Sequence, residues 1–344
     1  MPAAHTVREW LRSTLHLGPH AGAHRVAARA AVSLGVPLVV VVIMLDRADL
    51  SIYATFAAFA GLYGRFDAHA DRFRMQLGAG SMLILAMALG TLLALGDVPV
   101  PLAVGAVAVF GGVITVLAGA ARWHPPGALF AVFAIGATAG IPAASIRWAD
   151  AALTAVVTLA FALLIGAVGR WRPSVRRMPR GERPPRPATP WRALLRDGAI
   201  ITVTVALAGI VVSLFSDHWY WGQVAVVAAL GGPTLAARLT RATQRLAGTA
   251  VGVLIAGALL ALEPAPWAVV LAAIALQVGA ELFVGRNYAL TVLCVTPLAL
   301  LMVHLGAHTA PGLLVVDRLL DTLVGVALGV VAAVVAARMT RREA

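Results

Sequence analysis

Residues 98–120 read VPVPLAVGAVAVFGGVITVLAGA and contain no charged side chain. An α-helix rises about 1.5 Å per residue, so a run of this length matches the hydrocarbon core of a bilayer, which is about 30 Å thick. Backbone groups find no water in that core, so a spanning segment of this kind has to be helical. The stretch therefore predicts a transmembrane helix.

The rest of the chain repeats this pattern. With 60% hydrophobic residues, 12% charged residues and a mean hydropathy of +0.89, the sequence cannot cover a water-soluble surface. We expect an all-α polytopic membrane protein with about twelve transmembrane helices, of which 50–64 and 125–141 are short for a full span. The expected spans are residues 26–45, 50–64, 76–96, 98–120, 125–141, 149–170, 198–215, 219–235, 246–262, 265–284, 288–306 and 313–337.

Anchor residues of the first half recur in the second half. Arg29, Tyr53, Gly64, Arg74 and Gly90 return 167 positions later as Arg196, Tyr220, Gly231, Arg241 and Gly257, and Arg147, Asp150 and Arg170 return after 171 positions as Arg318, Asp321 and Arg341. Six spans per half predict two parallel six-helix repeats related by an axis along the membrane normal. The expected units are an interfacial N-terminal arm (1–24), the first repeat (25–172), a Pro/Arg-rich cytoplasmic linker (173–190) and the second repeat (191–344).

The basic residues predict the orientation. All 27 are arginines, and they collect at the N-terminal arm, the even-numbered loops, the linker and the C-terminus. Short loops rich in arginine lie in the cytoplasm, so both termini are expected there, with Arg47, Arg147 and Arg318 on the opposite side. Arginine without lysine favours a GC-rich bacterial gene, and hence the bacterial cytoplasmic (inner) membrane. The lipid bilayer, rather than nucleic acid, accounts for the net charge of +12.

No motif of a hydrolase, a nucleotide-binding protein or a metalloenzyme appears. We expect no enzyme activity, no catalytic residue, no cofactor and no metal, although His304 and His308 are four residues apart. Ionisable residues in or near a membrane are costly, and they are the candidates for function.

The strongest candidates are the pairs Arg147 with Asp150 and Arg318 with Asp321. At a spacing of three residues, each carboxylate can neutralise part of its guanidinium and leave donors for an anion. Anchoring of helix ends at the interface is the alternative. A second candidate is the cytoplasmic mouth, where Arg74, Arg241, Arg286, Asn287 and Tyr288 would attract organic anions, although topology alone also places arginines there.

Two further features bear on a binding site. Pro142 ends one short span, Pro297 interrupts another span, and Gly231, Gly232 and Pro233 end a third. Broken spans at related places in two repeats are typical of transporter binding sites. Ordinary helix packing is the alternative explanation. The aromatic residues Tyr53, Trp219, Tyr220 and Trp221 fall at predicted outer ends, where we expect interfacial anchors, with stacking on an aromatic substrate as the alternative.

The second half contains a Gly-Gly-Pro helix end, Arg238, Arg241 and Arg245 followed by Gly248-Thr249, then Arg286-Asn287-Tyr288 and Arg318-x-x-Asp321-Thr322-x-x-Gly325. On these residues it resembles the membrane domain of the fusaric acid resistance family. Arg74, Gly78, Arg147 and Asp150 carry a weaker likeness in the first half. It implies a relative of the aromatic carboxylic acid exporters and, more distantly, of the plant aluminium-activated malate transporters.

From these features we expect a membrane transporter that exports small organic anions such as aromatic carboxylic acids. Arg74, Arg241 and Arg286 would attract the anion, Arg147 and Arg318 would receive it, and protonation of Asp150 and Asp321 would couple export to the proton gradient. A passive anion channel and a membrane scaffold without transport activity are the alternatives.

Overall fold

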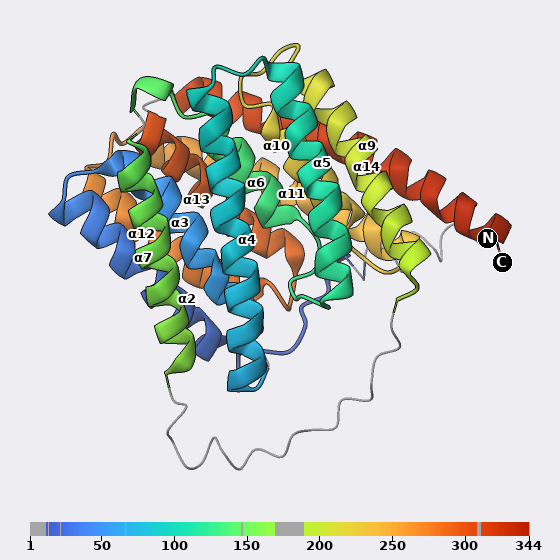
Figure 1. The fold of residues 1–344 in the computed structure, drawn as a ribbon, viewed down its shortest axis with the longest axis horizontal. Helices are drawn as coiled ribbons and strands as arrows, with labels where there is room; N and C mark the ends of the chain where they lie inside the picture. The colour runs from blue at the N-terminus through green and yellow to red at the C-terminus, as the bar shows by residue number, and fades with distance from the viewer. Residues whose placement is uncertain are drawn as a thin grey trace.

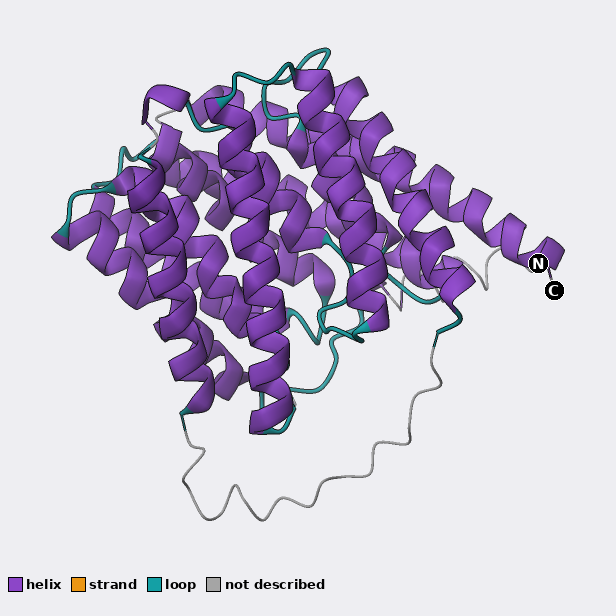
Figure 2. Cartoon of the chain, in the orientation of Figure 1, coloured by secondary structure: helices purple, strands orange, loops and turns teal. Residues whose placement is uncertain are grey.

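The computed structural model describes residues 12, 14–20, 22–65, 67–145, 147–168, 189–307 and 311–343. Within these residues all regular secondary structure is helical, as Figure 2 shows. The predicted linker, apart from residues 189 and 190, and most of the predicted interfacial arm lie outside the described residues.

Nine helices of the described part are long and apolar enough to cross a membrane, and this confirms a polytopic α-helical membrane protein. The first consists of α2 (Ala23–Leu38) and the π-helix η1 (Val39–Met44), with Pro37 inside α2. The other long helices are α4 (His69–Leu95), α5 (Val100–Ala120), α7 (Trp148–Ala167), α9 (Trp191–Val212), α11 (Leu235–Leu260), α12 (Pro266–Phe283), α13 (Tyr288–Ala307) and α14 (Pro311–Glu343).

Three shorter apolar segments complete the set of twelve. They are Ala48–Leu62, which contains the 3-10 turn η2 (Ala48–Leu50), α3 (Ser51–Ala58) and the 3-10 turn η3 (Phe59–Leu62), and the helices α6 (Leu129–Ala139) and α10 (Tyr220–Leu230). Every residue of α3 and α10 is buried, so neither helix meets lipid along its length. At about 1.5 Å per residue, an 11-residue helix covers only about half of the hydrocarbon core.

The short length of α10 corrects the expectation of a span over 219–235. The helix ends at Leu230 because Gly231 turns to an extended conformation and Gly232 adopts a φ of 141°, which favours glycine. Pro233 then prevents continuation of the helix, and Thr234 caps α11 by accepting a hydrogen bond from the amide of Ala237 at 3.2 Å. The Gly-Gly-Pro break expected from the sequence is therefore present.

The long helices surround the short ones (Figure 1). In the first half α4 packs against α6 and α7, and α3 packs against α7. In the second half α11 packs against α13 and α14, and α10 packs against α14. The halves meet through α5 on α9 and α2 on α12, while α10 reaches α6 and α13 reaches α3.

Small residues allow the closest of these contacts. A Cβ added to Gly325 of α14 would clash with the carbonyl oxygen of Gly222 on α10, and one added to Gly112 of α5 would lie 2.9 Å from the carbonyl oxygen of Gly198 on α9. Such close approach is how membrane helices gain packing energy, because lipid tails remove any hydrophobic drive for association.

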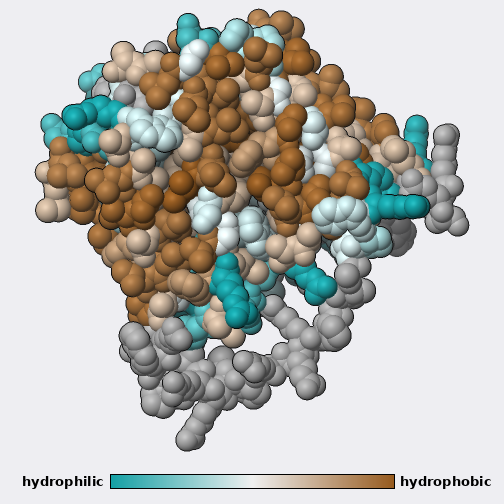
Figure 3. Space-filling model, viewed as in Figure 1, coloured by the Kyte–Doolittle hydropathy of each residue, from teal (hydrophilic) through white to brown (hydrophobic). Residues whose placement is uncertain are grey.

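Hydrophobic side chains cover most of the face of the bundle that Figure 3 shows, and strongly hydrophilic residues gather toward its edges. Large exposed residues such as Leu102, Leu153, Leu164 and Leu254 lie on the long helices. A surface of this kind is suited to lipid rather than to water.

Candidate functional site

A cavity of about 90 Å³ lies among the short helices, and both halves contribute to it. One wall consists of Phe56, Phe59, Phe130 and Phe133 from α3, η3 and α6. Phe56 contacts Phe59 and Phe133 edge to face, at centroid distances of 5.6 and 5.0 Å. Its polar lining residues are Thr55, Arg245, Gln277, Glu281, Thr291 and Arg318. The cavity thus combines an aromatic wall with buried charge.

Arg318 on α14 is completely buried, at 0% exposure. Its guanidinium carbon lies 5.0 Å from the ring centre of Trp221, which is also fully buried, and this is a cation–π contact. Its Nε and Nη1 have no hydrogen-bond partner among the described residues. A buried guanidinium with donors left over is normally matched by an anion or by water.

Asp321 does not neutralise Arg318 in the way that the spacing of three residues predicts. No ion pair within 4.0 Å joins the two side chains; the Oδ2 of Asp321 accepts a hydrogen bond from the Oγ of Ser216 at 3.0 Å, and its Oδ1 has no partner among the described residues. The Ser216 hydroxyl draws the carboxylate toward the turn before α10, while Trp221 holds the guanidinium. The side chains of Arg318 and Asp321 therefore do not form the predicted ion pair.

Arg245 on α11 is the second buried arginine of the cavity, at 3% exposure. Its Nη1 donates a hydrogen bond of 3.4 Å to the hydroxyl of Tyr288, and its Nε and Nη2 have no partner in the described part of the chain. Arg241, one turn earlier, lies over the Tyr288 ring at 4.0 Å. Tyr288 thus connects the partly exposed Arg241 with the buried Arg245.

The predicted site residues of the first half lie elsewhere. Asp150 lies 3.3 Å from the Nε of Arg147, as expected, but it also accepts a hydrogen bond of 2.7 Å from Arg47, which holds Asp49 as well. The Arg147 side chain is 75% exposed. Hydrogen bonds to Asp49 and Asp150 raise the pKa of Arg47. These residues form a surface ion-pair cluster outside the cavity.

The predicted residues of the arginine-rich mouth separate into three roles. Arg74 is exposed on α4. Arg286 donates to the carbonyl of Gly18 at 3.0 Å, and Asn287 donates to the carbonyls of Thr14 and His16 at 3.0 and 3.1 Å. Arg286 and Asn287 therefore hold the arm formed by residues 14–18, and Tyr288 alone of this triplet contacts a cavity arginine.

The aromatic residues expected at the membrane interface are buried instead. Tyr53, Trp219, Tyr220 and Trp221 have at most 7% exposure, because α3 and α10 lie inside the bundle. Sequence reasoning also missed Glu281, a carboxylate at 5% exposure on α12. A charged residue near the end of the apolar run 265–284 was the signal that could have found it.

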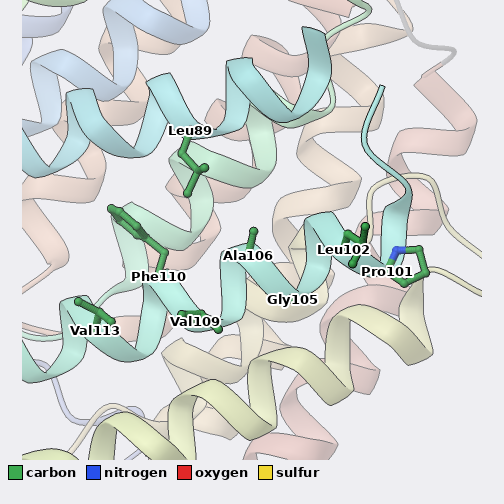
Figure 4. Close-up of a pocket in the computed structure, with 8 residues that line it drawn as sticks. All are labelled: Leu89, Pro101, Leu102, Gly105, Ala106, Val109, Phe110 and Val113. Carbon is green, nitrogen blue, oxygen red and sulfur yellow. The ribbon is translucent and has the colours of Figure 1, made fainter. Parts of the chain in front are cut away.

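A larger hollow of about 550 Å³ lies on the outer surface of α4 and α5 (Figure 4). Its lining is apolar, with Leu89, Phe110 and Val113 at one end and Pro101 and Leu102 at the other. It offers no charge to an anion and faces the lipid side of the bundle. Among the described residues no three His, Cys, Asp or Glu side chains could hold a metal; His308 of the predicted histidine pair lies outside them.

The fold and its buried, charged cavity define a multi-pass α-helical membrane protein. Residues 199–332 match the family model described as fusaric acid resistance protein-like, which confirms the expected resemblance over this part of the chain. Arg241, Arg245, Glu281, Arg318 and Asp321 all lie within the matched residues. No solved structure matches the chain.

A curated relative is "Uncharacterized membrane protein YvaC" of Bacillus subtilis (strain 168), which is 38% identical over 109 residues. The match covers 31% of this chain and only 17% of that protein. The likeness is thus to a membrane protein, over a limited part of both sequences.

Proposed function

We propose that the protein transports small organic anions across the membrane, and that aromatic carboxylates are the class it takes. The observation that carries this proposal is the pair Arg245 and Arg318, which are buried, keep unpaired N–H donors, and line the same cavity. Buried charges without a partner are unfavourable, and the cavity holds two arginines against the single carboxylate of Glu281, so it is adapted to an anion.

The side chains that line the cavity support an aromatic carboxylate as the substrate. A planar guanidinium can donate two parallel hydrogen bonds to a carboxylate, and the phenylalanine side chains can receive a ring edge to face. The volume of about 90 Å³ leaves no room for a bulky ligand. Trp221 and Tyr288 would hold the two guanidinium groups for this purpose.

The other predicted residues take outer roles in the proposal. Arg74, Arg241 and Arg286, at the arginine-rich end, would raise the local concentration of anions, and Arg147 with Asp150 would form the opposite mouth. With the arginine-rich end in the cytoplasm of a bacterial inner membrane, transport is outward. Asp321, buried beside Arg318, would tune that arginine and is one candidate for proton coupling.

The packing of the helices supports the predicted parallel repeat. Helix α2 occupies in the first half the place of α9 in the second, and α5 that of α12, so the contacts α5 with α9 and α2 with α12 are counterparts. Likewise α4 contacts α6 and α7 as α11 contacts α13 and α14. Substrate sites at the interface of such repeats are common in transporters.

The proposal is tested by flux in proteoliposomes loaded with salicylate, malate or chloride, with and without a pH gradient. Arg318→Ala should abolish salicylate flux, since it removes a donor of the cavity, while Arg338→Ala, an exposed arginine on the same helix, should not. Retained salicylate flux in folded Arg318→Ala protein would contradict the site. Equal flux of chloride would favour a channel, and no flux of any anion would favour a scaffold.

A further inference from the structure

The cavity of the proposed anion site also carries a carboxylate. Glu281 lies on α12, one turn after Gln277, and both side chains line the cavity. Its Oε2 lies 3.5 Å from the Nη2 of Arg65, and the same nitrogen donates to the main-chain carbonyl of Glu281 at 3.2 Å. A charge-assisted hydrogen bond is typically about 2.7–2.9 Å long, so this carboxylate is held loosely.

The charged groups that face Glu281 are cationic. Arg65 follows η3, and Arg29 on α2 donates a hydrogen bond of 3.2 Å to the main-chain carbonyl of Arg65. Arg245 and Arg318 line the same cavity. The helices packed against α12 also carry His24 and Arg25 on α2, and Tyr288, Cys294 and His304 on α13, whereas η1 has no titratable side chain. The Glu281 carboxylate is therefore balanced by positive charge.

Entry of an anion changes this balance. The incoming carboxylate engages Arg245 and Arg318 and cancels much of their field at Glu281. It also places a second negative charge in a cavity lined mainly by apolar side chains, where charges interact strongly. A proton on Glu281 removes one of the two negative charges and relieves that repulsion.

On this basis, which rests on the proposed function, we infer that Glu281 takes up a proton when an organic anion occupies the cavity, so that binding of the anion and binding of the proton are linked. The proton comes from the aqueous phase and bonds to a carboxylate oxygen of Glu281; no other bond changes. The occupied cavity then holds one negative charge fewer than it would with an ionised Glu281. This assigns the proton linkage to Glu281 rather than to Asp150 or Asp321.

Isothermal titration of the purified full-length protein with salicylate tests the inference. Measurements in two buffers of different ionisation enthalpy, over a pH range in which salicylate stays ionised, give the number of protons taken up. With one linked proton, the dissociation constant should rise by up to about tenfold per pH unit as the pH increases. Glu281→Gln should bind salicylate with a pH-independent affinity and take up no proton.

Two further variants keep the test decisive. Glu281→Asp retains a titratable carboxyl group and should retain proton uptake, and it covers the case in which Glu281→Gln fails to fold. Asp321→Asn should also retain proton uptake. Wild-type binding without proton uptake, unchanged uptake in Glu281→Gln, or uptake lost only in Asp321→Asn would overturn the inference and leave the anion site standing. Failure of the folded wild-type protein to bind salicylate at any pH would overturn both the inference about Glu281 and the proposed anion site.

Discussion

The guanidinium of Arg318 lies 5.0 Å from the ring centre of Trp221, and both side chains are fully buried where α14 packs against α10. The indole stabilises the positive charge and leaves the N–H donors of Arg318 unused. If an acidic side chain held Arg318 instead, those donors would already be hydrogen-bonded to its carboxylate. Trp221 therefore keeps Arg318 both in place and available.

Substitution of Trp221 tests this relationship. Trp221→Leu should weaken salicylate binding by about 5- to 30-fold, because a desolvated cation–π contact is worth about 1–2 kcal/mol and the released guanidinium can turn toward Asp321. Trp221→Phe keeps an aromatic face and should lose much less. Titration calorimetry on both purified variants gives the comparison, and equal affinities would argue against a positioning role for the ring.

The phenylalanine wall should determine the preference for rings. Phe133 lies edge to face with Phe56 at 5.0 Å and stacks with Tyr220 at 6.1 Å. Phe133→Leu preserves apolar volume but removes the aromatic contact, so salicylate should lose about 0.5–1.5 kcal/mol of binding free energy while hexanoate loses little. Competition of the two acids in a flux assay measures the ratio. A parallel loss for both would show that the wall acts only through its shape.

The contact between α10 and α14 should tolerate no added atoms. A Cβ on Gly325 clashes with the carbonyl oxygen of Gly222, which belongs to the backbone and cannot rotate away. Gly325→Ala should destabilise the protein by about 1–3 kcal/mol, seen as a lower melting temperature in detergent. Gly105→Ala is the matched control, because a Cβ there meets nothing within 4 Å. Similar melting temperatures for the two variants would contradict the predicted packing.

The ion-pair cluster of Arg47, Asp49 and Asp150 should matter little to stability. Its side chains are 26–30% exposed, and exposed ion pairs contribute less than about 1 kcal/mol. Arg47→Ala should therefore lower the melting temperature slightly at low ionic strength and not at high salt, where screening removes the contribution. A large decrease that persists at high salt would mean that the cluster holds α7 against the turn before α3.

Much of the fold follows from hydrophobicity and helix breakers alone. The charge-free run that includes α5 and the Gly231-Gly232-Pro233 break are visible in the sequence because membrane thickness and backbone geometry act locally. The burial of α10 is not visible, since an apolar helix inside a bundle has the same composition as one in lipid. The 11-residue length of α10 in the structure fits this burial, whereas the expected span over 219–235 did not indicate it.

The site was harder to predict than the fold. The spacing of Arg318 and Asp321 places them on one helix face, and Arg318 does line the cavity. Whether they pair depends on Ser216 and Trp221, which approach from another segment and leave no periodic signal near α14. Phe56 was overlooked for the same reason, since its role depends on helices distant in sequence, whereas Glu281 had a local signal as a charged residue near the end of an apolar run.

Gly18 and Arg286 are joined by two hydrogen bonds although they lie 268 residues apart. A ribosome adds about 5–20 residues per second, so the N-terminal segment waits for tens of seconds after it leaves the ribosome before its docking partner exists. Correct assembly therefore depends on events late in synthesis. Any protein or lipid that shelters residues 14–18 in that interval would influence how many chains reach the finished form.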